Sequence, residues 1–155
     1  QDLLAYIQPV FIDLDMNTVE PAIGAQRMDK VYAWKSMLDM GIHTSGGSDA
    51  PVVSFDAMEN IYFAVTRKNI SGQPQEGWIP SEKISVDEAV KLFTKNAAYA
   101  SYTEDENGTI EVGKNADFVV LEKNIYEIDP DEIKATKVDM TVLGGEIVYE
   151  REVEE

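Results

Sequence analysis

The chain has 155 residues, of which 44% are hydrophobic and 27% are charged, as in ordinary globular domains. These proportions exclude wholesale disorder and fibrous repeats. The 13 Lys and Arg residues against 29 Asp and Glu give a formal net charge of −16, which disfavours contact with phosphate backbones and anionic lipid. We therefore expect neither nucleic acid nor a membrane as a partner.

The chain has no Cys and only one His, His43. Disulfides, thiolate nucleophiles and Cys-based zinc sites are thereby excluded, as is any metal site that needs several His ligands from this chain. The lack of Cys is compatible with the reducing cytoplasm, where we expect the protein. No apolar run approaches the roughly 20 residues of a membrane span. Because the chain begins without Met, we expect a processed product or an excised part of a longer protein.

Predicted strands and helices alternate in the N-terminal half of the chain. The pattern predicts a strand over 5–11, a helix over 31–40 that ends at Gly41, a short strand over 42–45 and a helix over 56–65. Such βαβα alternation is typical of parallel strands covered by helices.

The next segment, 68–84, is rich in Gly, Pro, Gln and Ser around Trp78 and predicts a long surface loop. The sequence Ser85-Val86-Asp87-Glu88 then matches a capping box that opens a helix. A second helical segment is expected over 97–102.

Beyond Gly108 the pattern changes to short β-rich segments at 109–112, 116–121, 138–143 and 146–149. The last two are separated by Gly144-Gly145, a hairpin signal. We therefore divide the chain into a βα part over 1–107, a β part over 108–150 and an acidic tail over 151–155.

Asp49 is the strongest candidate for a catalytic or metal-binding residue. It follows a predicted strand within Gly46-Gly47-Ser48-Asp49-Ala50-Pro51, where the carboxyl ends of parallel strands place ligands. A carboxylate there can bind a hard metal or take a proton from water. The alternative is an Asp that caps backbone N–H groups, and the spacing alone favours this capping role.

The other candidates are weaker. His43 lies in a predicted strand without a second His or Cys, so a packed His is favoured over a ligand. Ser45 and Ser48 are weak candidates for a nucleophile, because the sequence offers no suitable general base near them. The Gly-Gly-Ser turn lacks the Lys of a phosphate-binding loop. We expect Trp34, Tyr62, Phe63 and Phe93 in the core, whereas Trp78 in the predicted loop is an aromatic residue whose binding role deserves a test.

Several motifs in order give the chain a resemblance to metal-dependent amidohydrolases of family 3, in the YtcJ-like branch that includes N-substituted formamide deformylases. The resemblance covers nearly the whole chain, from Gln8-Pro9 to Val148-Tyr149-Glu150. The residues that carry it are 42–52, Ala64-Val65-Thr66-Arg67, 85–89, 94–100 and 108–121.

This resemblance implies an α/β fold: the C-terminal part of a (β/α)8 barrel, with 5–11 as barrel strand 7 and 42–45 as strand 8, followed by strands of a small β-sandwich. Asp49 would match the strand-8 Asp that contacts the metal or its water and acts as general base and acid. The divalent metal, zinc in our expectation, would belong to the full-length protein, because the other ligands of the family have no counterpart here. The family gives no support to His43 as a ligand.

Two functions follow from this resemblance. The first is the C-terminal part of a hydrolase that acts on non-peptide C–N bonds of a small-molecule amide-type substrate and is inactive in isolation, with no metal bound by this chain alone. The second is a non-catalytic structural or oligomerisation module from a truncated relative. In both cases we expect a homo-oligomer, since strands taken from a barrel have unpaired edges.

Overall fold

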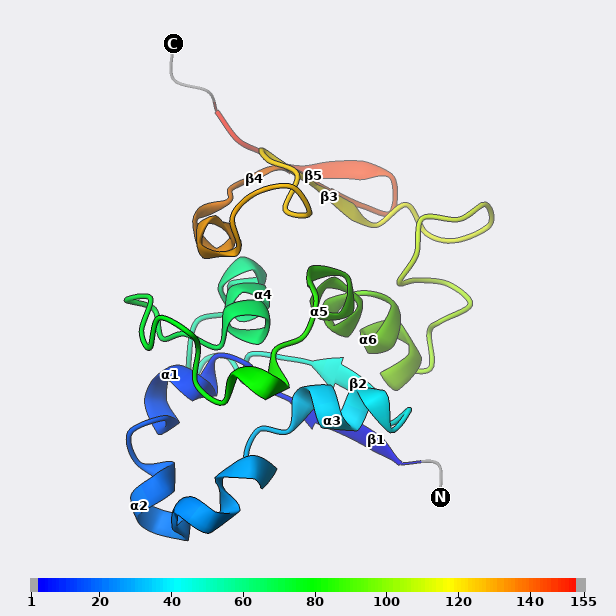
Figure 1. Ribbon diagram of the computed structural model, residues 1–155. Helices are drawn as coiled ribbons and strands as arrows, with labels where there is room; N and C mark the ends of the chain where they lie inside the picture. Colours follow the sequence, from blue (N-terminus) through cyan, green and yellow to red (C-terminus); the bar gives the residue numbers. More distant parts are fainter. Residues whose placement is uncertain (1–2, 153–155) are drawn as a thin grey trace.

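The computed structural model describes residues 3–152. Two small β-sheets lie on either side of a layer of helices (Figure 1). The strands are β1 (Leu4–Ile7), β2 (His43–Gly46), β3 (Phe118–Leu121), β4 (Val138–Leu143) and β5 (Glu146–Glu150). The α-helices are α1 (Phe11–Asp15), α2 (Val19–Ile23), α3 (Trp34–Asp39), α4 (Ala57–Thr66), α5 (Val86–Phe93) and α6 (Lys95–Ala100), and short 3-10 helices cover Ala25–Lys30, Pro80–Glu82 and Pro130–Ala135.

The first sheet confirms the expected parallel pairing. β1 and β2 run side by side in register from Leu4 opposite His43 to Ile7 opposite Gly46. The predicted strand over 5–11 is too long, however, because the chain turns into α1 directly after Pro9. There the N–H of Phe11 donates to the Gln8 carbonyl at 3.1 Å, which commits the backbone to a helical turn.

The helix predicted over 31–40 begins only at Trp34. Val31 is extended, and Tyr32 has a φ of 48°, so neither residue can continue a helix. The end of the helix is as predicted: Gly41 adopts a φ of 73°, and its N–H donates to the Leu38 carbonyl at 2.9 Å.

Side-chain caps fix the starts of α4 and α5. The Asp56 carboxylate accepts from the N–H of Met58 at 2.8 Å. The predicted capping box is confirmed, because Ser85 Oγ accepts from the N–H of Glu88 while the Glu88 carboxylate accepts from the N–H of Ser85. The second helical segment is α6, which begins two residues earlier than expected.

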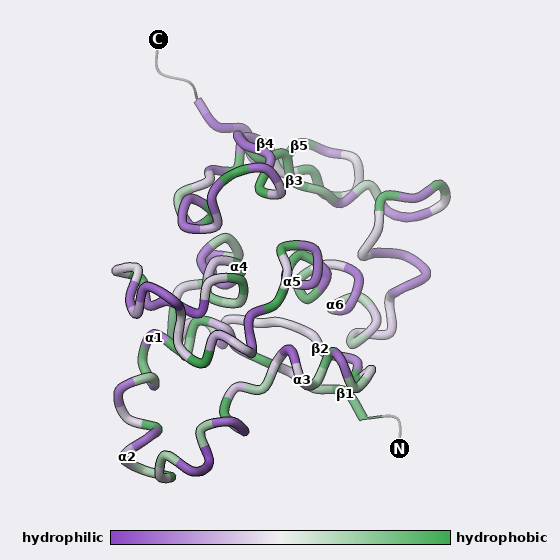
Figure 2. The backbone as a smooth tube through the Cα atoms, viewed as in Figure 1, coloured by the Kyte–Doolittle hydropathy of each residue, from purple (hydrophilic) through white to green (hydrophobic). Residues whose placement is uncertain are grey.

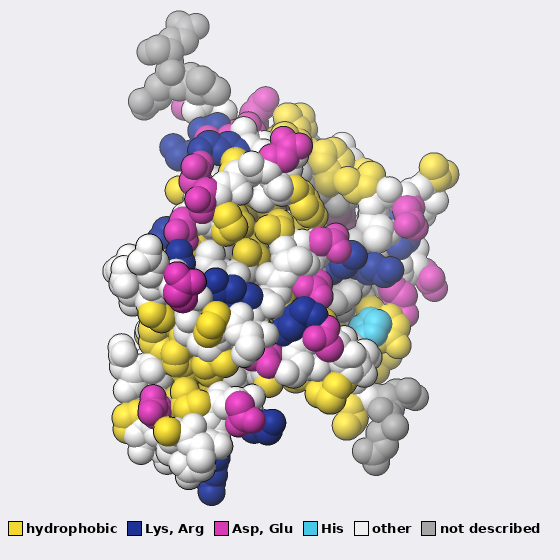
Figure 3. Space-filling view, viewed as in Figure 1, with side chains coloured by type: hydrophobic (Ala, Val, Ile, Leu, Met, Phe, Trp, Pro, Cys, Tyr) yellow, Lys and Arg dark blue, Asp and Glu magenta, His cyan; other side chains and the backbone are white. Residues whose placement is uncertain are grey.

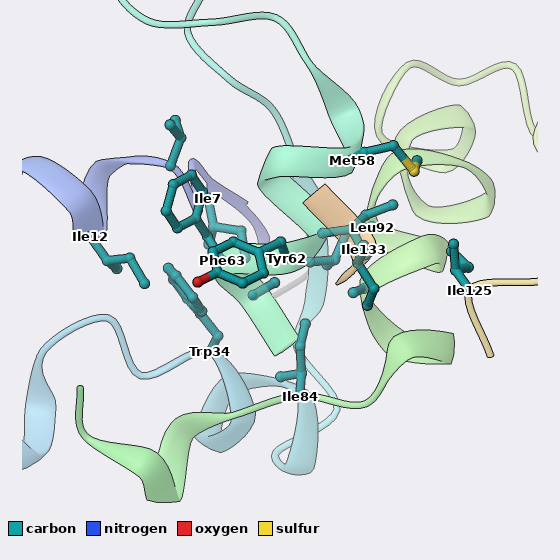
Figure 4. Packing of buried hydrophobic residues seen from close by; sticks show 14 residues of the cluster. Ile7, Ile12, Trp34, Met58, Tyr62, Phe63, Ile84, Leu92, Ile125 and Ile133 are labelled. Atoms are coloured by element: carbon teal, nitrogen blue, oxygen red, sulfur yellow. The ribbon is translucent and has the colours of Figure 1, made fainter. Parts of the chain in front are cut away.

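Helix α4 forms the centre of the core. Tyr62, Phe63 and Ala64 are at most 2% exposed. Trp34 and Ile84 pack against them from one side and Ile133 and Leu92 from another (Figure 4). Ile133 comes from the C-terminal part of the chain, so that part contributes to the same core. The division at 107/108 stays a prediction.

The second sheet is antiparallel, with the strand order β3-β4-β5. The predicted hairpin is confirmed: Gly144 and Gly145 have φ values of 59° and 83°, and the pairing closes at Leu143 opposite Glu146. In Figure 2 the hydrophobic colour follows the strands of this sheet as well as β1.

The segment 109–112, expected to be a strand, is not one. Lys114 folds it into a turn, since its ammonium group donates to the Glu104 carbonyl and to Thr109 Oγ1, both at 2.7 Å. Ile110 and Val112 point into solvent as a result. In the acidic tail, the Arg151 guanidinium forms an ion pair with the Asp139 carboxylate. Residues 153–155 of this tail lie outside the described residues. Among residues 3–152, no helix has the length and apolar character needed to cross a membrane.

Candidate active site at the ends of β1 and β2

The two parallel strands end at the same edge of their sheet. The N–H of Gly47 donates to the Ile7 carbonyl at 2.9 Å, which extends the strand pairing by one step beyond Gly46. From this point the loop 47–56 leads to α4. The carboxyl ends of strands are where α/β folds place their ligands, so this loop is the candidate active-site segment.

Asp49 has the unusual geometry in this loop. Its φ is 62°, in the left-handed region that Asp and Asn enter more readily than most other residues. Its carbonyl accepts from the N–H of Val52 at 2.9 Å, while its exposed carboxylate makes no hydrogen bond or ion pair within residues 3–152. The neighbouring N–H of Ala50 is bound instead by Ser48 Oγ at 3.3 Å. The side chain of Asp49 therefore does not perform the capping role that its spacing favoured.

Packing from α5 and α6 fixes the strand below the loop. The ring of Phe93 lies against the backbone of Gly46, where a Cβ atom would be only 2.7 Å from Phe93 Cζ. The side-chain amide of Asn96 donates to the Thr44 carbonyl at 2.9 Å. These contacts hold the last residues of β2 and hence the start of the loop.

Asn60 on α4 fixes the end of the other strand, and the sequence analysis missed it. This residue is fully buried, and its Oδ1 accepts from the N–H of Val10 at 3.2 Å, while its amide nitrogen donates to the Asp56 carbonyl at 3.0 Å. A polar residue within the apolar run of α4 was the available signal, because buried amides occur where they are hydrogen-bonded.

The two serines have structural positions. Ser45 is 5% exposed within β2, and Ser48 Oγ is engaged in the turn that it forms with Ala50. The N–H of Gly47 donates to the Ile7 carbonyl, so this donor of the Gly-Gly-Ser turn is already satisfied within the protein.

His43 is distant from Asp49. It begins β2, whereas Asp49 follows the end of the strand, and four strand residues span about 10 Å. Its ring stacks on Tyr99 with the ring centres 3.8 Å apart. Figure 3 shows the single His at the edge of the molecule beside hydrophobic side chains. His43 is nevertheless an exposed residue at the start of β2, so the expectation of a packed His rather than a ligand stays a prediction.

Trp78 belongs to a buried cluster around Arg67. The Arg67 guanidinium lies 4.6 Å from the ring centre of Trp34 and 5.7 Å from that of Trp78, and its Nε donates to the Trp78 carbonyl at 2.6 Å. Burial lowers the pKa of Arg67 to about 10. The segment 68–84 is thus a surface loop over residues 70–76, as predicted, whereas Trp78 near its end packs beside Arg67 and has a structural role there.

The described residues fit one ligand of a metal centre and not a whole centre. Within residues 3–152, no three His, Cys, Asp or Glu side chains converge as a metal site requires. The Asp49 carboxylate is a hard oxygen donor and has no hydrogen-bond or ion-pair partner within these residues. Such a free carboxylate fits the role of one ligand in a metal centre.

Comparison with known protein families gives one match over almost the whole chain, to the amidohydrolase family at residues 3–149. The putative amidohydrolase YtcJ of Bacillus subtilis is 38% identical over 145 residues, which make up 94% of this chain and 27% of that protein. The N-substituted formamide deformylase of Arthrobacter pascens is 35% identical over 122 residues, 79% of this chain and 22% of that protein. The chain therefore spans about a quarter of the length of these relatives.

Solved structures agree on the fold. A metal-dependent hydrolase from Pyrococcus horikoshii superposes with a TM-score of 0.72 over 83% of this chain and 26% of that one, at 20% identity. A metal-dependent hydrolase from Pyrococcus furiosus superposes with a TM-score of 0.62 over 74% of this chain and 22% of that one, at 26% identity.

Proposed function

Because this chain belongs to the amidohydrolase family, we propose that the whole protein containing it is a metal-dependent hydrolase of non-peptide C–N bonds, and that this chain supplies its proton-transferring carboxylate, Asp49. In this proposal β1 and β2 are strands 7 and 8 of a (β/α)8 barrel, and β3-β4-β5 is one share of a small β-sandwich. The substrate is a small molecule with an amide-type bond.

One observation carries the proposal. Asp49 is held in a left-handed conformation at the carboxyl end of a parallel strand, and its carboxylate has no partner within the described residues. A free carboxylate at the carboxyl end of a parallel strand is where α/β folds place groups that act on ligands. A capping Asp would instead point its oxygens at neighbouring N–H groups.

The chemistry assigned to Asp49 is a single proton transfer in two directions. As the oxygen of water bonds to the carbonyl carbon, the carboxylate accepts the proton that the water loses. As the C–N bond breaks, Asp49 returns this proton to the leaving nitrogen, and the products are a carboxylic acid and an amine. A divalent metal, zinc in our proposal, supplies Lewis acidity towards the substrate carbonyl when it is bound.

The chain alone is inactive in this proposal, because one carboxylate holds a metal too weakly for catalysis. The second candidate, a non-catalytic oligomerisation module, is favoured by one observation. β1 and β2 pair only with each other among the described residues, so each has an outer edge that is open to another strand.

The test is Asp49→Asn in the whole protein. We expect metal content to stay close to that of the wild type and kcat to fall by roughly 1,000-fold or more, because an amide fills the same volume but cannot take up the proton. Asp56→Asn is the matched control on the same loop, since Asn caps a helix as well as Asp does. Near-normal kcat in Asp49→Asn would contradict the proposal and favour the second candidate.

A further inference from the structure

The loop that carries Asp49 also carries two large apolar side chains that no part of the described chain covers. Val52 is 68% exposed and Phe55 is 87% exposed. Most other large hydrophobic residues of this half of the chain are at least partly buried in the core. These two are thus the apolar surface that accompanies the proposed catalytic carboxylate.

Hydrogen bonds hold both residues in place. The bond from the N–H of Val52 to the Asp49 carbonyl, 2.9 Å long, closes a turn, which brings the Cα atoms of the two residues within about 7 Å. Phe55 sits between Ser54, whose Oγ accepts from the N–H of Asp56 at 3.1 Å, and Asp56, which caps α4. The turn therefore sets the position of Val52 relative to Asp49, and the cap of α4 fixes the backbone on which Phe55 follows on the same loop.

The intervening residue makes the contact with the protein interior. Val53 is half-buried and packs against the hydrophobic core, whereas Val52 and Phe55 lie outside it. The loop is therefore anchored through Val53, and neither Val52 nor Phe55 is needed for that anchoring.

We propose that Val52 and Phe55 form an apolar wall that contacts the substrate next to the bond that Asp49 helps to break. Ligand pockets are lined mainly by apolar side chains around a few polar groups, and here the polar group is the Asp49 carboxylate. The substrate class is then an amide that carries a compact apolar group adjacent to the scissile C–N bond. This inference rests on the proposed function.

Matched substrates test the wall in the whole protein. N-cyclohexylacetamide and N-(oxan-4-yl)acetamide have nearly the same shape, but the second has a ring oxygen in place of one CH₂. Cyclohexanecarboxamide and oxane-4-carboxamide form the same comparison on the acyl side. We expect the wild type to prefer the cyclohexyl member of one pair, and the pair that shows the preference tells which side of the bond faces the wall.

In Phe55→Ala the ratio of kcat/KM values within that pair should fall roughly tenfold, which is typical for lost contacts in an apolar pocket. Phe55→Leu should restore most of the ratio. Tyr102→Ala, which removes another exposed aromatic side chain outside the loop, should leave it unchanged. A wild type without preference, or a Phe55→Ala ratio equal to that of the wild type, would overturn the inference. Equal losses on all four substrates together with a lower Tm would also overturn it, because Phe55 would then pack against protein.

A binding measurement separates this inference from the proposed function. Magnetisation transfer from the protein to N-cyclohexylacetamide and to cyclohexanecarboxamide is measured by NMR for the wild type and for Phe55→Ala. If neither compound is hydrolysed but one binds in a Phe55-dependent manner, the proposed function fails and the wall stands. If hydrolysis depends on Asp49 but binding and selectivity do not depend on Phe55, the wall fails and the proposed function stands.

Discussion

The ring of Phe93 occupies the space that a side chain on Gly46 would need. A Cβ atom at Gly46 would lie 2.7 Å from Phe93 Cζ and 3.0 Å from the two neighbouring ring carbons. The last residue of β2 is consequently in direct contact with α5, and the loop that carries Asp49 begins one residue later.

Gly46→Ala should therefore destabilise the chain by about 1–3 kcal/mol, since the Phe93 ring must move to make room. Urea denaturation followed by circular dichroism measures this difference. Gly47→Ala is the matched control, because a Cβ atom there meets nothing within 4 Å. Equal stability of the two variants would show that the Phe93 ring moves aside without lowering the free energy of unfolding.

Tyr32 predicts a pH dependence of stability. Burial and the hydrogen bond from its hydroxyl to Asp15 raise the pKa of Tyr32 above the usual value of about 10. Above that pH the unfolded chain ionises this tyrosine while the folded chain keeps it protonated, so the free energy of unfolding falls as the pH rises. Tyr32→Phe should lose stability less steeply between about pH 10 and 11.

Urea denaturation of the wild type and of Tyr32→Phe at pH 8, 9, 10 and 11 measures this dependence. The lowered pKa of Arg67 acts in the opposite direction, and since the charges of the two groups influence each other, the difference between the proteins reports Tyr32 together with its effect on Arg67. Tyr102→Phe, at an exposed position, should follow the wild type. Parallel curves for all three proteins would contradict the prediction.

The isolated chain should contain far less than one equivalent of zinc. Residues 3–152 bring no three candidate ligands together, and a single carboxylate gives weak binding. Elemental analysis after dialysis against micromolar zinc measures the content, with Asp49→Ala as the reference. One tightly held zinc that Asp49→Ala loses would show that this chain assembles a metal centre by itself.

The isolated chain should also form a homodimer or a larger oligomer. Among the described residues the β1-β2 sheet has open edges, and Tyr6 within β1 and Leu3 next to it are 61% and 69% exposed. Hydrophobic side chains lie at the surface near this end of the molecule (Figure 3). A contact of more than about 1,000 Å² would outweigh the repulsion between the chains, which is screened beyond about 10 Å at ordinary salt.

Light scattering at micromolar concentration gives the oligomeric state. Leu3→Lys combined with Tyr6→Lys should shift the chain towards the monomer, whereas Met40→Lys, at an exposed position off the strand, should not. A monomeric wild type that unfolds cooperatively would refute this prediction.

Local chemistry explains which elements the sequence predicts. The capping box at Ser85 and the Gly144-Gly145 hairpin are encoded within a few residues, and both are confirmed. The segment 109–112 has a strand-like composition, but the ammonium group of Lys114 draws the backbone around it into a turn. Backbone hydrogen bonds, such as the one from the N–H of Asn115 to the Glu106 carbonyl at 2.9 Å, close the same turn, and hydrophobic periodicity does not reveal them.

The candidate site likewise depends on contacts that a local sequence pattern does not reveal. The position of Asp49 after a strand is visible in the sequence, but the left-handed backbone that leaves its carboxylate without a partner is not. Asn60 is 50 residues from Val10, whose N–H it binds, so no local pattern reveals that contact. The Arg67 cluster likewise joins residues from three separated segments, and the composition of 68–84 does not show that Trp78 packs beside Arg67.

Helix α4 and its C-cap residue Arg67 hold two points of the long crossover between β1 and β2. Asn60 accepts from Val10 where the crossover begins, and Nη1 of Arg67 donates to the Tyr32 carbonyl at 3.0 Å just before α3. Between these two clamps, α2 and the 3-10 helix Ala25–Lys30 contain no buried residue. This middle stretch is therefore suited to grafting: a foreign sequence of different length can replace it while both strand ends keep their positions.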